Sequence, residues 1–146
     1  MLSNGSCSSR EGPSPYNRLF EFGYKVQGQN CQMVFTSVTG HLMNLDFPPE
    51  KRGWYSCQPR ELIDAIPVRK IVTPDKEKVA ENLRIEARKC AWLILWLDCD
   101  REGENIAFEV IDVCTAVKPS LRILRARFSA LSHNDVTRAL NNLIAP

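Results

Sequence analysis

The sequence predicts an α/β fold in which a parallel sheet is flanked by helices and extended by a β-hairpin. Residues 91–97 (AWLILWL) are apolar without alternation, a pattern typical of a strand covered on both faces. A second strand pattern, LRILRARF, follows over residues 121–128, and helical patterns precede, separate and follow the two. Because helix and strand alternate along the chain, the sequence predicts βαβ units around a parallel sheet.

The N-terminal part of the chain is predicted to contribute the hairpin. Residues 1–18 mix Ser, Gly, Pro and charged side chains and are expected to form an irregular arm, so that the domain itself covers residues 19–146. Two aromatic and β-branched runs, 19–26 and 31–38, flank the sequence Gln-Gly-Gln-Asn, which predicts a hairpin with its turn near Gly28.

Prolines divide the middle of the chain. Residues 45–54 contain two prolines and a glycine and are expected to be loop, whereas residues 59–66 predict one short helix that Pro67 stops. Pro74 suits a first helical turn, and residues 75–90 follow it with good helix formers. This helix carries one narrow apolar stripe that repeats every four residues, and we expect it to lie at a surface. The stripe consists of Val79, Leu83 and Ala87.

Two more helices are predicted in the C-terminal third. One extends from Gly103 to a stop at Pro119, and the other begins after Ser132, which forms a capping pair with Asp135. Each has an apolar face suited to packing on a sheet. These faces consist of Ile106, Val110, Ile111 and Cys114 in the first, and Val136, Ala139, Leu140 and Leu143 in the second.

Composition restricts the class of protein. The formal net charge of +2 is too mild to indicate nucleic-acid binding by itself. The longest apolar run is far shorter than the roughly 20 residues of a membrane helix, and the first residues have no apolar signal core. No pair of the six cysteines has C-x-x-C spacing, so we expect reduced, mostly buried thiols in an intracellular protein.

An acidic cluster directly follows the predicted buried strand. Ligands of α/β sheets bind outside the carboxyl ends of the strands, which is where Asp98, Asp100 and Glu102 should lie. Carboxylates placed this close repel one another unless a cation neutralises them, and Mg²⁺ prefers such oxygen ligands. The pattern therefore predicts magnesium or phosphate chemistry. The alternative is structural: the acids offset a helix dipole and pair with Arg101.

A calcium loop is a second alternative for the same residues. Asp98, Asp100, Glu102, Gly103 and Glu109 occupy positions 1, 3, 5, 6 and 12 of an EF-hand loop. Three features oppose it: Glu at position 5, a strand-like segment where an EF-hand has a helix, and helical periodicity across the loop itself.

Three motifs then reveal a family resemblance. LWLDCDREGENIAFEVI (95–111) resembles the acidic motif of the Toprim domain, a Rossmann-like α/β fold, in type IA DNA topoisomerases. TSVTGHLMNLDF (36–47) is similar to the Gly-His motif of that family, and LRARFSALSHNDV (124–136) to the segment that follows the acidic motif. SREGPSPYNRLFEF (9–22) fits as well, and the order is the family's. The sequence looks most similar to the eukaryotic topoisomerase III branch, more alpha-like than beta-like.

The resemblance implies a reaction and assigns residues to it. In the family, a tyrosine cuts one DNA strand through a phosphotyrosine bond, another strand passes through the gap, and the break is resealed. By resemblance Asp98, Asp100 and Glu102 match the acidic triad that holds Mg²⁺, with Glu102 the candidate catalytic carboxylate. Arg101 and His41 match motif positions beside it and are candidate DNA contacts.

The resemblance also implies partners and location: single-stranded DNA, a RecQ-type helicase and OB-fold proteins, in the nucleus and without a membrane. Nothing in the chain corresponds to the N-terminal strand, catalytic Glu-Lys pair and helix of the family's Toprim domain. The three tyrosines match no family nucleophile. We therefore expect residues 19–146 to be a partial Toprim domain, from a topoisomerase fragment that is inactive alone. The alternatives are another Toprim enzyme, such as a primase or nuclease, or a non-catalytic module that binds DNA or a partner.

Single residues add smaller signals. His41 is a candidate phosphate contact, although one histidine after a glycine is often structural. Strand alternation predicts that Arg125 and Arg127 share one face, and Arg127 is the favoured DNA contact. Trp92 and Trp96 stand within the predicted buried strand and are assigned to the core.

Overall fold

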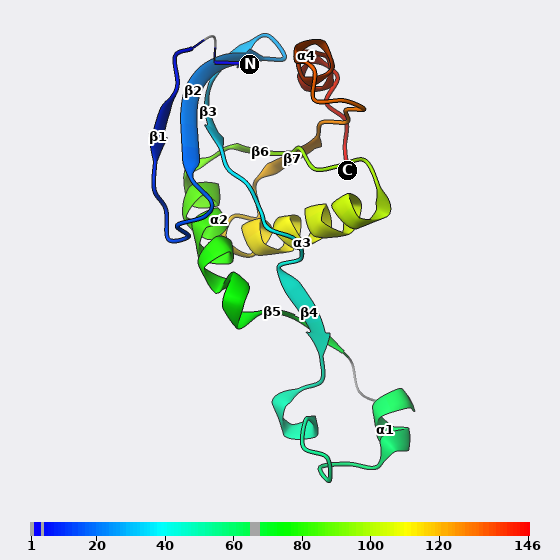
Figure 1. The fold of residues 1–146 in the computed structure, drawn as a ribbon. Coiled ribbons are helices and arrows are strands. Elements are labelled where there is room, and N and C mark those ends of the chain that lie inside the picture. Colours follow the sequence, from blue (N-terminus) through cyan, green and yellow to red (C-terminus); the bar gives the residue numbers. More distant parts are fainter. Residues whose placement is uncertain (1, 4, 65–67) are drawn as a thin grey trace.

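A parallel βαβ unit forms the centre of the protein in a computed structural model, which describes residues 2–3, 5–64 and 68–146 (Figure 1). Strand β6 pairs in parallel with β7, with Trp92 opposite Arg122 and Leu95 opposite Arg125, and α3 connects the two. The predicted α/β class with a parallel sheet and flanking helices is confirmed. The elements are β1 (Ser8–Arg10), β2 (Leu19–Val26), β3 (Gln29–Phe35), β4 (Met43–Asp46), η1 (Pro49–Lys51), α1 (Pro59–Asp64), β5 (Arg69–Val72), η2 (Pro74–Lys76), α2 (Glu77–Lys89), β6 (Trp92–Leu95), α3 (Arg101–Val117), β7 (Arg122–Arg125) and α4 (His133–Asn141).

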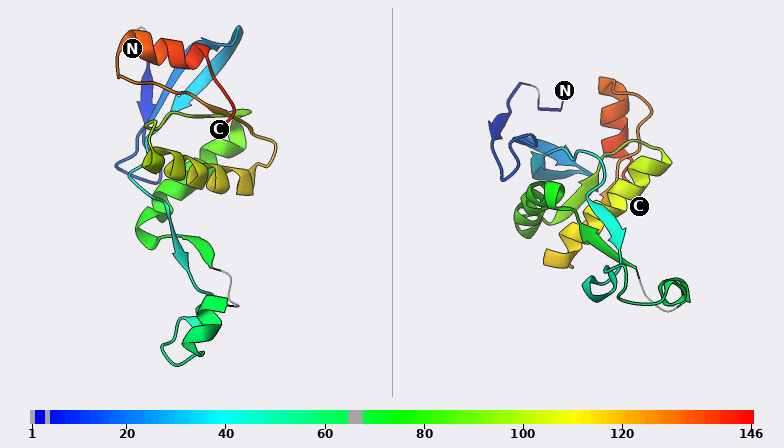
Figure 2. Two further views of the ribbon diagram at one scale, coloured as in Figure 1. Left: turned by 90° about the vertical axis from the view of Figure 1, so that its right-hand side faces the viewer. Right: turned by 60° about the horizontal axis from the view of Figure 1, so that its bottom comes forward.

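Helices cover the two sides of this small sheet. Figures 1 and 2 show β6 and β7 between α3 on one side and α4 on the other, with α2 packed against α3. The apolar stripe predicted on α2 is buried, as are most of the residues predicted for the inner face of α3. These two helices therefore supply most of the core cluster, which consists of Leu42, Val79, Ala80, Leu83, Ala87, Leu95, Ala107, Val110, Val113, Cys114 and Leu121.

The predicted hairpin is present as β2 and β3. Its turn is the pair Gln27-Gly28, whose φ values of 48° and 84° are the left-handed conformation that a two-residue hairpin turn requires. The N-terminal arm differs from the prediction, because β1 pairs antiparallel with β2 and makes a three-stranded sheet. Propensity is low in Ser8–Arg10, so the strand depends on the open edge of β2 and could not be read from local sequence.

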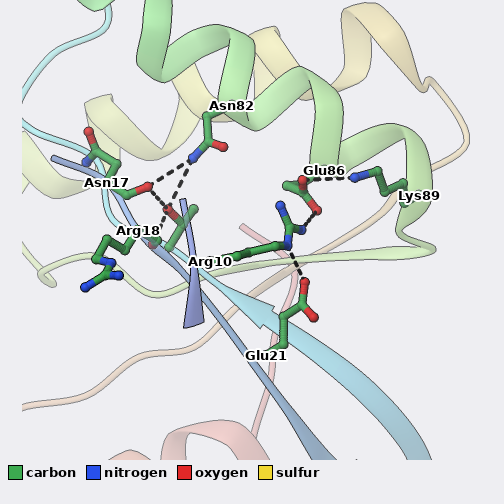
Figure 3. Close-up of polar contacts among 8 residues, drawn as sticks. Arg10, Asn17, Arg18, Glu21, Asn82, Glu86 and Lys89 are labelled. Atoms are coloured by element: carbon green, nitrogen blue, oxygen red, sulfur yellow. Dashed lines mark hydrogen bonds and ion pairs between the residues drawn. The ribbon is translucent and has the colours of Figure 1, made fainter. Parts of the chain in front are cut away.

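Ion pairs attach this added strand to the core (Figure 3). Arg10 donates to Glu21 of β2 at 2.6 Å and to Glu86 of α2 at 2.7 Å, and Lys89 donates to Glu86 at 3.1 Å. Burial opposes ionisation of Glu86, but the hydrogen bonds from Arg10 and Lys89 outweigh it and lower the pKa of the carboxyl. Arg10 therefore ties β1 to both a strand and a helix.

A projecting arm lies between β3 and α2. Strand β4 pairs antiparallel with β5, with Leu45 opposite Lys70, and Figures 1 and 2 show the pair carrying η1 and α1 away from the body. Residues 45–54 were predicted to be loop, which is wrong for Leu45 and Asp46, because a distant partner strand supplies the hydrogen bonds. The short helix predicted at 59–66 is confirmed as α1 up to Asp64. Its predicted stop at Pro67 lies outside the described residues.

Strand β6 is less covered than its apolar sequence predicts. Leu95 is buried, whereas Trp92, Leu93 and Ile94 are only half-buried. Within the described chain β6 pairs with β7 alone, and its residues line a cavity of about 1190 Å³. Trp92 lies under the Arg122 guanidinium at 4.7 Å, and Trp96 meets the ring of Phe35 edge-to-face. Both tryptophans were predicted to be core residues, and both are half-buried instead.

The six cysteines are free thiols, as predicted. The expectation that most are buried is wrong, because only Cys114 is buried, whereas Cys7 and Cys99 are exposed. Burial raises the pKa of Cys114 to about 12 and also raises the pKa of Cys90. In the part of the chain that the structure describes, no helix has the length and apolarity needed to cross a membrane.

Candidate metal and nucleic-acid site

The acidic cluster lies at the carboxyl end of β6, where the sequence predicts it. Asp98 and Asp100 follow the strand, and Glu102 lies in the first turn of α3. All three are exposed, and all three line the cavity that borders β6. The cluster thus opens onto a hollow in the surface rather than onto the core.

Asp100 already has a structural role. Its backbone is extended, and its carboxylate accepts a 2.6 Å hydrogen bond from the amide of Gly103, which makes Asp100 the N-cap of α3. The structural alternative considered for the cluster is therefore realised at this residue. One oxygen of Asp100 is occupied by the helix, while the other is not used by the cap.

The arrangement suits a partial rather than a closed cation site. Among the described residues, no three His, Cys, Asp or Glu side chains are grouped closely enough to hold a metal ion. Mg²⁺ is typically held by one or two carboxylates, with water and phosphate oxygens completing its shell. Hard oxygen donors from Asp98, Asp100 and Glu102 around one cavity fit that kind of site, whereas they do not form a three-carboxylate cage.

Gly103 lets the helix approach the acidic turn closely. It is buried, and a Cβ atom built at this position would overlap the main-chain carbonyl of Asp98. Because the clash is with backbone, it cannot be relieved by turning a side chain. A residue other than glycine would therefore push the start of α3 away from the segment that carries Asp98 and Asp100.

Arg125 holds the acidic segment from beneath. Its side chain is 2% exposed and donates to the main-chain oxygens of Leu97 and Asp98, both at 2.8 Å. It also pairs with Glu104 of α3 at 2.9 Å, so that one guanidinium binds both the segment after β6 and the start of α3. Further bonds go to the carbonyls of Leu95 and Ala126.

The predicted common face of Arg125 and Arg127 is wrong. Leu124, Arg125 and Ala126 are all buried, because β7 ends at Arg125 and the chain beyond it no longer alternates as a strand. Arg127 is exposed, as a DNA contact requires. Sequence analysis missed the role of Arg125, and the only available signal was an arginine at the end of a short strand that follows the acidic cluster in the chain.

The two other candidate DNA contacts are also exposed. Arg101 is the first residue of α3 and lies between Asp100 and Glu102. His41 lies in the segment before β4, and its Nδ1 is 2.9 Å from Oε1 of Glu109. Arg101 is therefore close to the acidic cluster because it is a neighbour of Asp100 and Glu102 in the chain. His41, in contrast, is positioned by its contact with Glu109 in the middle of α3.

The calcium alternative is contradicted by the fold. A strand, β6, precedes the acidic residues where an EF-hand has a helix, and α3 begins at Arg101, inside the would-be loop. Glu109, the required last ligand, is buried on α3 and accepts hydrogen bonds from the amides of Leu42 and Met43. It is therefore turned toward another segment of the chain.

Fold and site together define a class: an α/β domain with an acidic turn at the carboxyl end of a parallel strand, suited to a divalent cation and a phosphate. The family model for the Toprim domain matches residues 11–131. The chain belongs to the Toprim domain family.

Relatives identify the branch that the chain resembles. Over the whole chain it is 56% identical to DNA topoisomerase 3-alpha of Arabidopsis thaliana and 49% identical to DNA topoisomerase 3-alpha of Drosophila melanogaster. Identity to DNA topoisomerase 3-beta of Oryza sativa subsp. japonica is 43% over 99% of the chain. The alignments span 16%, 12% and 16% of these relatives. The predicted resemblance to topoisomerase III is confirmed, and identity is higher to these alpha proteins than to the beta protein.

Proposed function

We propose that the chain is the magnesium- and DNA-binding part of a type IA topoisomerase III, an enzyme that cuts, passes and reseals single DNA strands. Toprim membership together with the acidic turn at the end of β6 supports this most directly. The fold supplies the turn. Similarity over the whole of this chain, which spans 16% and 12% of the two DNA topoisomerase 3-alpha proteins, supports the reaction class.

In this proposal each exposed polar residue of the site has a role. Asp98, Asp100 and Glu102 would hold Mg²⁺ at a position where it can also bind oxygens of the DNA backbone. Bound there, the ion would neutralise phosphate charge and position the phosphates around the broken strand. Glu102 is the candidate catalytic carboxylate by its match to the family's acidic motif, and unlike Asp100 it does not cap α3.

The basic candidates would grip the DNA backbone. Arg101 and Arg127 are exposed on the two segments that follow β6 and β7, the strands whose carboxyl ends meet at the acidic turn. Guanidinium groups bind phosphate oxygens in a fixed fork geometry, and such contacts position a strand without reading its sequence. His41 would add a third contact from the segment before β4.

The remaining parts of the proposal concern the whole protein. Its substrate would be single-stranded DNA, its partners a RecQ-type helicase and OB-fold proteins, and its location the nucleus. We propose that this chain alone does not relax DNA, because Tyr16, Tyr24 and Tyr55 lie in no motif that matches the family's nucleophile.

Magnesium titration of the 146-residue chain tests the site. Trp96 lines the cavity together with the three acids, so its fluorescence should change as Mg²⁺ binds. The double variant Asp98→Asn/Asp100→Asn removes two charges while asparagine keeps the N-cap, and its response should vanish. Asp112→Asn, an exposed aspartate farther along α3, is the matched control and should respond like wild type. Equal responses in all three proteins would remove the metal site from the proposal.

A further inference from the structure

We propose that Glu109 is a positioning residue that fixes the His41 imidazole with Nε2 directed outward, toward the phosphate backbone of single-stranded DNA. This inference rests on the proposed function, because it deepens the role given there to His41. It concerns a carboxylate that lies outside the acidic cluster and that the sequence suggested only as the last ligand of a calcium loop, which the fold contradicts.

Both carboxylate oxygens of Glu109 have hydrogen-bond partners. It is 5% exposed, and its Oε2 accepts from the amide of Leu42 at 2.7 Å and from that of Met43 at 3.1 Å. Its Oε1 lies 2.9 Å from Nδ1 of His41. Three donors from consecutive residues thus converge on one buried carboxylate, which satisfies the requirement that a buried charge be hydrogen-bonded.

The contact decides which ring nitrogen is available. A carboxylate can only accept, so Nδ1 of His41 carries the proton that it donates to Glu109. The His41 side chain remains 41% exposed, which leaves Nε2 as the nitrogen that can meet a ligand. When the ring is protonated, Nε2–H donates to a phosphate oxygen while Nδ1 stays on Glu109.

One helix connects this contact with the acidic cluster. Glu109 lies about two turns beyond Arg101 on α3, the helix that Asp100 caps. Gly40, next to His41, has φ +69° and lines the same cavity as Asp98, Asp100 and Glu102. Because a helix is rigid over two turns, Glu109 sets the position of His41 relative to the acids as well as its ring orientation.

Histidine NMR and DNA binding test the proposal on the 146-residue chain. His133 is exposed and is the only other histidine, so it serves as an internal reference in long-range ¹H–¹⁵N spectra. In wild type, neutral His41 should show the Nδ1–H tautomer. Glu109→Gln keeps an oxygen for the two amides but adds an NH₂ donor, so that tautomer preference should be lost while His133 is unchanged.

Affinity for oligothymidine, measured by fluorescence anisotropy with Mg²⁺ present, gives the second readout. Glu109→Gln and His41→Ala should each weaken binding by about threefold to tenfold, the size of one ordinary hydrogen bond, because water competes for a partly exposed site. Since Glu109 acts through His41, the double variant should bind no more weakly than His41→Ala.

Two results would overturn the inference. One is an unchanged His41 tautomer in Glu109→Gln, and the other is a full additional loss of affinity in the double variant, which would indicate a merely structural carboxylate. Failure of the proposed function gives a different result, because wild type itself would then not bind oligothymidine and His41 would not be a DNA contact. The His41 tautomer would still show whether Glu109 orients the ring.

Discussion

The guanidinium of Arg125 donates a 2.8 Å hydrogen bond to the main-chain carbonyl of Asp98. A fully buried cation thereby holds the backbone of an exposed acidic turn, and it does so from the neighbouring parallel strand. The same group binds Glu104 of α3, so the turn is fixed at its strand end and at its helix end. The acidic side chains can stay free for a ligand because the backbone beneath them is held by another residue.

Arg125→Met is expected to destabilise the protein strongly. The substitution preserves most of the volume but leaves the carbonyls of Leu97 and Asp98 without their donor, and leaving a buried acceptor unsatisfied costs about 1–3 kcal/mol. The lost pair with Glu104 adds little, because that side chain is 39% exposed. Urea unfolding followed by circular dichroism measures the change. The control is Arg127→Met, an exposed position two residues away, which should stay within about 0.5 kcal/mol of wild type. A similar small change at both positions would contradict the role given to Arg125.

Two substitutions at Asp100 should separate its capping role from its charge. Asp100→Ala is expected to lower the free energy of unfolding by about 0.5–2 kcal/mol, whereas Asp100→Asn keeps the bond to the Gly103 amide and should cost little. Both should weaken the Mg²⁺ response, because both remove a carboxylate.

The N-cap of α4 supplies the control for Asp100. Ser132 accepts from the amide of Asp135 at 3.1 Å and does not line the cavity that the three acids share, so Ser132→Ala should reduce stability and leave the Mg²⁺ response intact. If Asp100→Asn binds Mg²⁺ like wild type, Asp100 is a cap and not a ligand.

Gly103→Ala is expected to destabilise the protein although alanine favours helix. In an open helix interior the change would stabilise by about 1 kcal/mol. Here the new Cβ meets the carbonyl of Asp98, and forcing atoms into a tight site typically costs about 1–3 kcal/mol. Thermal unfolding compares it with Gly23→Ala in β2, where a Cβ meets nothing within 4 Å. A higher melting temperature for Gly103→Ala would show that the helix start can shift freely.

Stability should fall at high pH because of Cys114. Burial raises the pKa of this thiol to about 12, whereas a thiol in the unfolded chain has an ordinary value near 9. Between these values the unfolded state releases a proton that the folded state keeps, so the stabilising contribution is complete below pH 9 and is lost as pH rises toward 12. The slope is at most about 1.4 kcal/mol per pH unit.

The difference between wild type and Cys114→Ala isolates that contribution, because other titrating groups cancel. Measured by urea unfolding, the free energy of unfolding of wild type should therefore fall relative to that of Cys114→Ala as pH rises above 9. In the folded protein at pH 8, iodoacetamide should modify the exposed Cys7 and Cys99 and spare Cys114. Rapid labelling of Cys114, or a pH-independent difference, would contradict its burial.

Local patterns predicted the hairpin, the main helices and the two parallel strands, because each of these elements depends on nearby residues. The four-residue repeat on α2, the cap at Ser132 and the Gln27-Gly28 turn are interactions within a few positions of the chain. Strands β1, β4 and β5 were not predicted, since each is stabilised by a partner strand that the local sequence does not contain.

The sequence by itself determined the α/β class, the place of the acidic cluster at the end of β6, and the family, because order and motif spacing are properties of the chain. Only the tertiary structure decided which polar groups meet. It buried Arg125 beneath the acidic turn, made Asp100 the N-cap of α3 and placed Glu109 beside His41, which lies 68 positions earlier in the chain. Such pairings depend on how strands and helices pack, and packing joins residues that no local spacing relates.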